Sequence, residues 1–189
     1  MGAVSPVPFF DEALRERTVR EIIEPTIQGL VKDNLPYQGF VFFGLINTSK
    51  GPKVIEYNVR MGDPETEVVI PRLETDIVDL FVAMHNGTLD QIDVQVTTQT
   101  AATVMAVSGG YPGSYEKGKV IDGLRDFEGT TVYHAGTKPG EQITTSGGRV
   151  MAFTSFGTDK DEALAKSYAA LKEVSFEGMN YRTDIGFDL

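Results

Sequence analysis

Apolar and polar residues alternate most clearly from Lys53 to Arg60, where the sequence reads K-V-I-E-Y-N-V-R. Successive side chains of a strand point to opposite faces, so this alternation predicts a strand with two different faces. One face would carry Glu56, Asn58 and Arg60. Carboxylate and amide oxygens suit a hard divalent cation, and a guanidinium suits phosphate. The pattern therefore predicts a cation site beside a phosphate.

The residues before this strand predict a helix and a partner strand. Apolar residues recur at helical spacing from Phe10 to Lys32, and Pro25 inside this run predicts a kink or a break. Residues 1–9 contain two prolines and are expected to form a loop. The apolar run Phe40–Ile46 is typical of a strand buried on both faces. Turn-forming residues at 47–52 then predict an antiparallel hairpin with the strand at Lys53.

Two helices are expected after the hairpin. Asp63-Pro64-Glu65-Thr66-Glu67 is a favourable helix start, with Asp63 as the N-cap, Pro64 at the first helical position and acids in the first turn. This structural role accounts for Asp63 and Glu65 as well as a functional role does. A second helix is expected from Asp76 to His85, ending at Asn86-Gly87.

The sequence changes in character beyond about Asp93. Short β-rich segments alternate with glycine-rich turns, and one amphipathic helix follows. We expect strands at 94–107, 130–135, 142–145 and 149–156, a loop at 109–118 and a helix at 158–174. The fold class is therefore predicted as α+β, with a first domain at 1–92 and a small β-rich domain at 93–189.

Composition narrows the functional classes. The 189 residues are 41% hydrophobic and 23% charged, as in ordinary globular proteins. The net charge of −10, without a cluster of lysines and arginines, argues against nucleic-acid or acidic-membrane binding. The absence of cysteine excludes disulfides and thiolate sites and fits a cytoplasmic protein. The sequence shows no signal peptide and no apolar run of about 20 residues, so a soluble protein is expected.

The motif E-Y-N-V-R-M-G-D-P-E-T-E, which begins at Glu56, resembles the closing strand of the ATP-grasp superfamily. More narrowly, it is similar to the phosphoribosylamine–glycine ligase family. Further stretches resemble that family in the same order: M-G-A-V-S-P at 1–6, Y-Q-G-F-V-F-F-G-L-I at 37–46, G-Y-P-G-S-Y-E-K-G-K-V-I at 110–121, Y-H-A-G-T at 133–137 and F-E-G-M-N-Y-R-T-D-I-G at 176–186. The resemblance implies the C-terminal half of an ATP-grasp lobe, with antiparallel sheet and helices, followed by the family's C-terminal domain.

This resemblance implies an activity. Family members join glycine to 5-phosphoribosylamine with ATP, through an acyl phosphate, and form glycinamide ribonucleotide in purine biosynthesis. The implied metal is Mg²⁺ or Mn²⁺, ATP is a co-substrate, and the other partners are small molecules. No oligomeric state follows from the sequence. The family is about twice as long as this chain, so we expect a fragment that lacks the nucleotide-gripping part and is inactive alone.

The resemblance also implies roles for individual residues. Glu56 and Asn58 would hold the metal, with water and ATP phosphates completing its coordination. Arg60 would contact the γ-phosphate or the acyl phosphate, and Asp63 would meet the substrate amine. Glu65 is a weaker candidate, because the helix start already explains it. No residue stands out as a general base.

Alternative interpretations remain for several features. The chain could belong to another ATP-grasp ligase or carboxylase, although biotin carboxylases usually follow the arginine with Q-V-E-H rather than M-G-D-P-E. It could also be a non-catalytic scaffold. His85 and His134 are expected to be structural, while Tyr111 and Lys117 are left as candidates for the active-site cleft. The glycines at 109–118 lack the strand-to-helix context of a phosphate loop, so a turn-rich loop is expected.

Overall fold

The computed structural model describes residues 1–189 and divides into two compact units. The larger unit comprises residues 1–6, 63–74 and 95–189, and the smaller unit comprises residues 7–62 and 75–94. The chain therefore passes twice through the smaller unit before the long C-terminal segment begins. The domains expected at 1–92 and 93–189 stay a prediction, and the last crossing between the units follows Val94.

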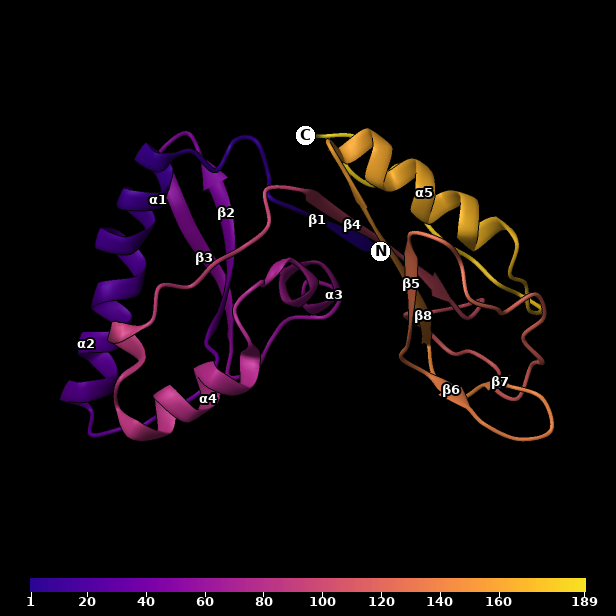
Figure 1. Ribbon diagram of the computed structural model, residues 1–189, viewed down its shortest axis with the longest axis horizontal. Helices are drawn as coiled ribbons and strands as arrows, with labels where there is room; N and C mark the ends of the chain where they lie inside the picture. Colours follow the sequence, from indigo (N-terminus) through magenta and orange to yellow (C-terminus); the bar gives the residue numbers. More distant parts are fainter. The chain divides into compact units, whose positions relative to one another are not determined.

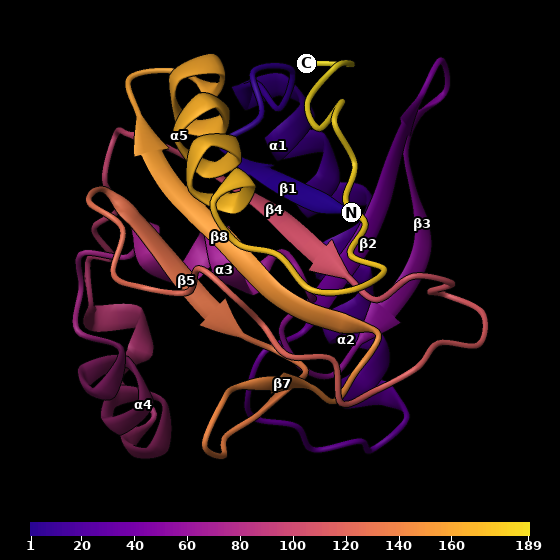
Figure 2. The ribbon, with the colours of Figure 1, turned by 90° about the vertical axis from the view of Figure 1, so that its right-hand side faces the viewer.

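An antiparallel four-stranded sheet forms the centre of the larger unit. Its strands lie in the order β1 (Gly2–Ser5), β4 (Thr100–Val107), β8 (Arg149–Gly157) and β5 (Thr130–His134). Helix α5 (Lys160–Lys172) lies along one side of this sheet, as Figure 2 shows. The predicted strands near 130–135 and 149–156 and the predicted helix near 158–174 are confirmed.

The expectation of a loop over residues 1–9 is wrong for Gly2–Ser5. These residues pair with β4 in the register Gly2↔Val104 to Ser5↔Ala101. A backbone that pairs with the edge of a sheet needs no strand pattern of its own, because the partner supplies the hydrogen bonds. The two prolines follow the strand, where they interrupt no ladder bond.

The core of the larger unit lies between the sheet and α5. Strands β4 and β8 and the inner face of α5 contribute its fully buried members, which include Val104, Phe153 and Leu171. Ser167 is also buried on α5, and its hydroxyl donates to the Ala102 carbonyl oxygen at 3.0 Å. A buried hydroxyl costs little free energy when it is hydrogen-bonded in this way.

Smaller elements complete the larger unit. Helix α3 (Thr66–Val69) continues into the 3₁₀ turn Ile70–Arg72 and contacts β1, β4 and β8. The expected strand at 142–145 is reduced to β7 (Thr144–Thr145), which pairs with β6 (Thr137–Lys138). Residues 109–118 form an irregular loop, as predicted.

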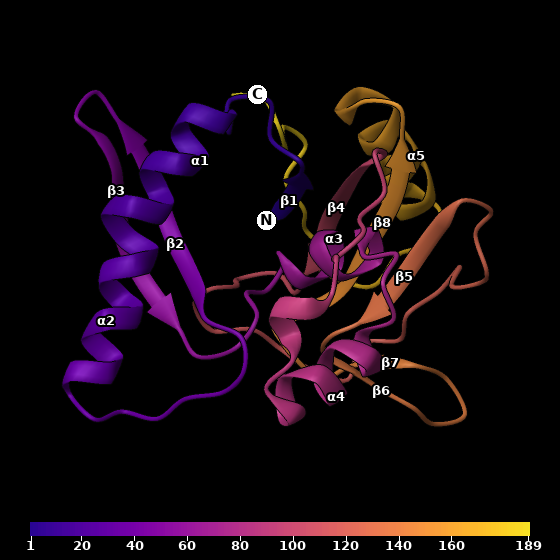
Figure 3. The same cartoon turned by 60° about the vertical axis from the view of Figure 1, so that its left-hand side comes forward.

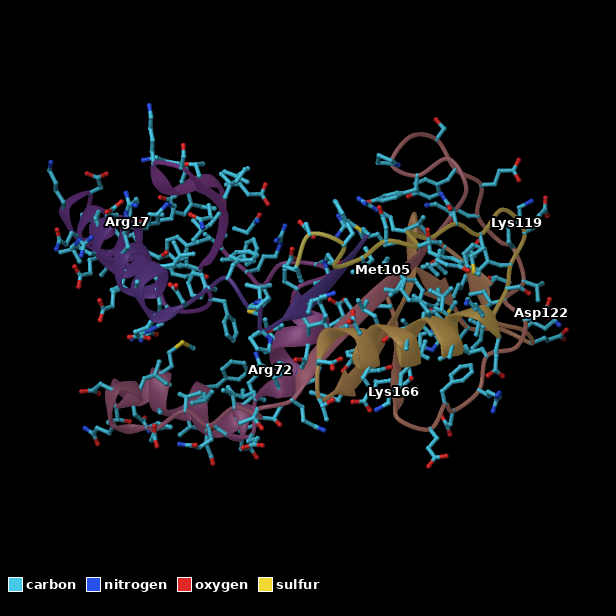
Figure 4. The ribbon with its side chains drawn as sticks, turned by 90° about the horizontal axis from the view of Figure 1, so that it is seen from above. Arg17, Arg72, Met105, Lys119, Asp122 and Lys166 are labelled. Carbon is cyan, nitrogen blue, oxygen red and sulfur yellow. The ribbon has the colours of Figure 1, made fainter.

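Arg72 ties three segments of the larger unit together. Its guanidinium donates to Ser5 Oγ at 2.8 Å, to the Thr97 carbonyl oxygen at 3.0 Å and to the Gln99 carbonyl oxygen at 3.1 Å. These partners lie at the end of β1 and in the segment that leads into β4, and Figure 4 labels the arginine. Burial lowers the pKa of Arg72, because it disfavours the charged guanidinium, and none of these three partners carries a negative charge to oppose this effect.

A long helical run and a hairpin make up most of the smaller unit (Figures 1 and 3). Helix α1 (Glu12–Thr18), a π-helical turn (Val19–Ile23) and α2 (Glu24–Lys32) follow one another without interruption. Pro25 lies at the second position of α2, directly after the π-helical turn. The expected irregularity is present as the wider π-helical turn, and the helix does not break.

The predicted hairpin is confirmed. Strand β2 (Phe42–Thr48) pairs antiparallel with β3 (Gly51–Asn58), and the register shifts between Gly44 and Leu45. Arg17 of α1 donates to the Lys50 carbonyl oxygen at 2.6 Å and so holds the hairpin turn against the helix (Figure 4). The turn itself is shorter than predicted, because both strands extend into it.

The expectation that Phe40–Ile46 is buried on both faces is wrong. Residues of β2 are at most half-buried, and Ile46 is 51% exposed. The sheet of this unit has only the two strands of the hairpin. An apolar run cannot distinguish a strand covered on both faces from one covered on a single face, because coverage depends on distant segments.

The predicted second helix is confirmed as α4 (Ile77–Asn86), which is followed by the 3₁₀ turn Leu89–Gln91. The Asp76 carboxylate accepts from the Val78 N–H at 2.8 Å, as an N-cap does. Gly87 ends the helix in the left-handed conformation at φ 69°. None of the helices combines the length and the apolar character that a membrane crossing requires.

Candidate functional site

Glu56 and Asn58 lie side by side near the end of β3. They are two residues apart on one strand, so their side chains share a face. The Asn58 side-chain amide donates to Glu56 Oε1 at 3.0 Å. Glu56 is exposed and Asn58 is half-buried, which leaves oxygens of the pair open to a ligand. The strand pattern thus correctly predicted that these two side chains meet.

The opposite strand makes room for this pair. Gly44 on β2 lies directly across from Glu56 in the register. A Cβ atom at Gly44 would come within 2.8 Å of Glu56 Cγ. The glycine therefore lets the Glu56 side chain lie over the neighbouring strand, where a larger residue would displace it.

Arg60 lies beyond the strand that was expected to hold it. Strand β3 ends at Asn58, and Arg60 is exposed in the segment that follows. Its Nη1 donates to the Met61 carbonyl oxygen at 3.2 Å. One exposed guanidinium with a single backbone contact keeps most of its donors available for an anion. The strand face that was expected to carry three residues therefore carries only Glu56 and Asn58, and the exposed Arg60 follows the strand.

Asp63 belongs to the larger unit, and its predicted role as a helix N-cap is wrong. Helix α3 begins at Thr66, with Glu65 in the cap position, and the Asp63–Pro64 peptide bond is cis. The Asp63 carboxylate instead forms an ion pair with Arg149, whose Nη1 lies 3.0 Å from Oδ1. The same nitrogen donates to the Asp63 carbonyl oxygen at 2.6 Å.

Arg149 contacts two of the residues that the sequence singled out, and the sequence pattern did not point to it. It opens β8, and its Nε donates to the Tyr111 hydroxyl at 2.8 Å. The Tyr111 hydrogen bond and the neighbouring Asp63 carboxylate hold the pKa of Arg149 above its usual value. Tyr111 was a candidate for the cleft, and the structure places it on this arginine. No local pattern connects positions 63, 111 and 149, so only the fold could join them.

Glu67 is the acid of this segment with the most unusual surroundings. Its Oε2 is buried without a hydrogen-bond partner. Burial raises the pKa of Glu67, and the charges of Asp63 and Glu65 raise it further, while Arg149 opposes them. Burial also raises the pKa of Tyr133, with a smaller contribution from the charge of Glu67. The sequence motif contained Glu67, but its burial depends on tertiary packing.

The other residues singled out by sequence have modest contacts. His134 Nδ1 lies 2.8 Å from Thr137 Oγ1 at the end of β5, which fits the expected structural role. His85 lies in the last turn of α4, also as expected. The Lys117 ammonium lies 6.0 Å from the centre of the Tyr115 ring, within the glycine-rich loop.

Nowhere in the chain do three or more His, Cys, Asp or Glu side chains gather closely enough to hold a metal ion. The Glu56–Asn58 pair is consistent with a weaker arrangement. Mg²⁺ usually keeps several waters and takes only one or two protein carboxylates besides substrate phosphates. An adjacent carboxylate and amide with exposed oxygens fit that mode of binding and do not fit a cage built by protein alone.

Two family models match this chain. Residues 1–66 match the ATP-grasp (A) domain of phosphoribosylglycinamide synthetase, and residues 101–188 match the C domain of the same enzyme. The A-domain match contains β1, the long helical run and the hairpin with Glu56 and Asn58. The C-domain match contains Tyr111 and Arg149.

Relatives and solved structures agree with these matches. Phosphoribosylamine–glycine ligase of Rhizobium meliloti is 45% identical over 99% of this chain, which covers 45% of that protein. A bifunctional purine biosynthetic protein of Schizosaccharomyces pombe is 42% identical over 98% of this chain and 24% of its own length. The crystal structure of the Thermotoga maritima ligase matches 97% of this chain and 46% of that one, with a TM-score of 0.84 at 32% identity.

The fold also resembles that of a biotin carboxylase domain. The biotin carboxylase domain of the Hydrogenobacter thermophilus 2-oxoglutarate carboxylase has a TM-score of 0.67 at 16% identity, over 96% of this chain and 40% of that one. This likeness concerns the fold alone. The chain spans slightly less than half the length of the Rhizobium, Agrobacterium and Vibrio ligases it matches. Its sequence, its two domain matches and its structure together show that the chain belongs to the phosphoribosylamine–glycine ligase family of ATP-grasp proteins.

Proposed function

We propose that this chain supplies part of the active site of an ATP-dependent ligase that joins glycine to 5-phosphoribosylamine. The product is glycinamide ribonucleotide, made in the cytoplasm during purine biosynthesis. Relatives named phosphoribosylamine–glycine ligase support the reaction, and the Glu56–Asn58 contact at 3.0 Å is the observation that carries the site. ATP, glycine and 5-phosphoribosylamine are all small molecules.

The proposed reaction has two steps. A glycine carboxylate oxygen attacks the γ-phosphorus of ATP, which forms an acyl phosphate and releases ADP. The amine of phosphoribosylamine then attacks the acyl carbon, so that a C–N bond forms, the C–O bond to phosphate breaks and the amine loses a proton. Both steps require donors and cations around a phosphoryl group whose charge is shifting.

Glu56 and Asn58 would hold Mg²⁺ or Mn²⁺ with their side-chain oxygens. The bound cation would neutralise charge on the ATP phosphates. Arg60 is exposed and has one backbone contact, so its guanidinium can turn to the γ-phosphate or the acyl phosphate. Asp63 would accept a hydrogen bond from the substrate amine. No role is assigned to Glu65, which occupies the cap position of a short helix.

A substitution at Glu56 tests the metal assignment. In a full-length ligase that contains this sequence, Glu56→Ala should lower turnover on the order of a hundredfold, as losing a key electrostatic contact does. Paramagnetic resonance of Mn²⁺ with ATP should also show weaker metal binding. Steady-state product formation and the Mn²⁺ spectrum are the two measurements.

Lys53→Ala is the matched control, because Lys53 is an exposed residue on the same strand. It should leave both turnover and the Mn²⁺ spectrum close to those of the unmodified enzyme. Near-normal activity of Glu56→Ala would contradict the metal assignment. Absence of product from the unmodified full-length enzyme would contradict the proposed reaction itself.

A further inference from the structure

Arg149 joins two segments that are far apart in sequence. Its Nη1 contacts Asp63 twice, at the carbonyl oxygen (2.6 Å) and at Oδ1 (3.0 Å). Its Nε donates to the Tyr111 hydroxyl at 2.8 Å. All three residues belong to the larger unit. One planar guanidinium thus fixes both the backbone and the side chain of Asp63, while a tyrosine fixes the guanidinium.

The fold holds Arg149 and Tyr111 rigidly. Arg149 pairs with Val107 at an irregular point in the β4–β8 ladder, at the very start of β8. The preceding residue, Gly148, accepts from the Ser108 N–H at 2.8 Å and lies against the Tyr111 ring. A Cβ atom at Gly148 would come within 2.2 Å of Tyr111 Cδ2. Any larger residue there would therefore push the tyrosine away from the arginine.

Stability does not explain this arrangement well. The Arg149 and Asp63 side chains are 34% and 47% exposed. Exposed ion pairs contribute between about 0 and 1 kcal/mol, because water screens them. A tyrosine, a backbone carbonyl and a carboxylate converging on one guanidinium are better suited to holding a group in a fixed geometry than to stabilising the fold.

The ion pair with Arg149 engages one oxygen of the Asp63 carboxylate. Arg149 Nη1 lies 3.0 Å from Oδ1, so this contact leaves Oδ2 for another donor. The Arg149 guanidinium is charged at neutral pH, and the Tyr111 hydrogen bond raises its pKa further. A carboxylate oriented through one oxygen can present the other to an N–H donor.

We propose that Arg149 is a positioning residue for the amine substrate: supported by Tyr111, it holds Asp63 so that Oδ2 accepts a hydrogen bond from the attacking amine. This inference rests on the proposed function and deepens it. The family resemblance implies a place for Asp63 at the substrate amine, and Arg149 is the group that orients it. Arg149 touches none of the three substrates in this proposal.

Two variants test the proposal in the full-length enzyme. Arg149→Met removes every contact to Asp63, and Tyr111→Phe removes only the hydroxyl that steadies the arginine. Loss of a hydrogen bond to a charged group corresponds to roughly tenfold or more in affinity. We expect Arg149→Met to raise the KM for phosphoribosylamine about tenfold, and Tyr111→Phe to raise it by a smaller factor. The KM values for ATP and glycine should stay within about twofold.

A second readout needs no activity. The Val68 and Val69 amides donate to the Glu65 carbonyl oxygen, so their exchange reports on the segment that Arg149 holds. Their exchange in the 189-residue chain should become faster in both variants, while exchange in β4 stays unchanged. A merely structural role would instead accelerate exchange throughout the sheet and lower kcat without selective change in one KM. Arg149→Lys keeps the charge but not the planar fork, and it should restore the amine KM only in part.

Arg125→Met is the matched control, because Arg125 also forms an exposed ion pair in the larger unit, with Glu173. It should change neither the amine KM nor exchange at Val68 and Val69. The proposal is overturned if Arg149→Met leaves the amine KM and the exchange of Val68 and Val69 within twofold of the unmodified enzyme. An unmodified enzyme that forms product while Arg149→Met behaves normally would contradict this inference and leave the proposed reaction standing.

Discussion

Glu67 places one carboxylate oxygen, Oε2, in the interior of the larger unit without a hydrogen-bond partner. Burial is the main cause that raises its pKa, and the nearby charges of Asp63 and Glu65 add to it. Arg149 lowers it again, but by less than the burial raises it. Ionising Glu67 in the folded chain therefore costs free energy that ionising it in the unfolded chain does not.

Replacing Glu67 by glutamine should change how stability depends on pH. The folded-state pKa of Glu67 lies above the usual 4.5, so the contribution of this side chain to stability is fully present below pH 4.5. It is lost as the pH rises through the folded pKa. A glutamine cannot ionise. The free energy of unfolding of Glu67→Gln should therefore exceed that of the unmodified chain by on the order of 1 kcal/mol near neutral pH. Urea unfolding at pH 4 and at pH 8 measures the difference.

Glu128→Gln provides the comparison, because Glu128 is an exposed acid of the same unit. It should follow the pH dependence of the unmodified chain. If Glu67→Gln shows the same change in unfolding free energy between the two pH values as the unmodified chain, Glu67 is not the source of the pH dependence.

The strands of the two units differ in how deeply they are buried. In the larger unit, Val104 of β4 and Phe153 of β8 are fully buried. In the smaller unit, Ile55 and Tyr57 of β3 are 67% and 51% exposed. Strands with few buried apolar contacts open by local fluctuation, whereas strands in a core open only when the whole unit unfolds.

Amide exchange should therefore separate the two sheets. We expect the amides of β2 and β3 to exchange at least about a hundredfold faster than those of β4 and β8, because local opening requires less free energy. Mass spectrometry of peptides from the native chain over a time course measures both rates.

Leu171→Ala tests whether the larger unit and the hairpin of the smaller unit open independently. It creates a cavity beneath β4 and β8, which should cost about 2–5 kcal/mol in the larger unit. Exchange in β4 and β8 should become faster, and exchange in the hairpin should not change. Equal exchange rates in both sheets of the unmodified chain would contradict the difference in stability.

At the scale of the whole molecule, the chain spans about 45% of the Rhizobium meliloti relative. The proposed reaction needs a site that clamps ATP and excludes water. The residues proposed for it here comprise a metal-binding pair, an arginine and an oriented aspartate. We therefore propose that the 189-residue chain alone is a scaffold that does not turn over substrate.

Incubation of the purified chain with ATP, glycine and phosphoribosylamine tests this expectation. No glycinamide ribonucleotide or ADP should form above the rate without protein, while the full-length enzyme should form both under the same conditions. Product formed by the purified chain, and abolished by Glu56→Ala in the same chain, would show that this segment contains a complete site.

Local sequence patterns were sufficient to predict the features whose geometry depends on neighbouring residues. The two-residue period of a strand brought Glu56 and Asn58 onto one face, and the Asp76 cap and Gly87 bounded α4. These features depend on backbone sterics and on hydrogen bonds within a few residues, which composition and spacing reveal. The motif around Glu56 also identified the family.

Only the tertiary structure decided features that join distant segments. The pairing of Gly2–Ser5 with β4 depends on a sheet edge about a hundred residues away in sequence. Asp63 was expected to cap a helix, but its carboxylate pairs with Arg149, and Glu65 occupies the cap position of α3. Charge, burial and hydrogen bonds between such residues follow from packing, and packing is a property of the folded chain.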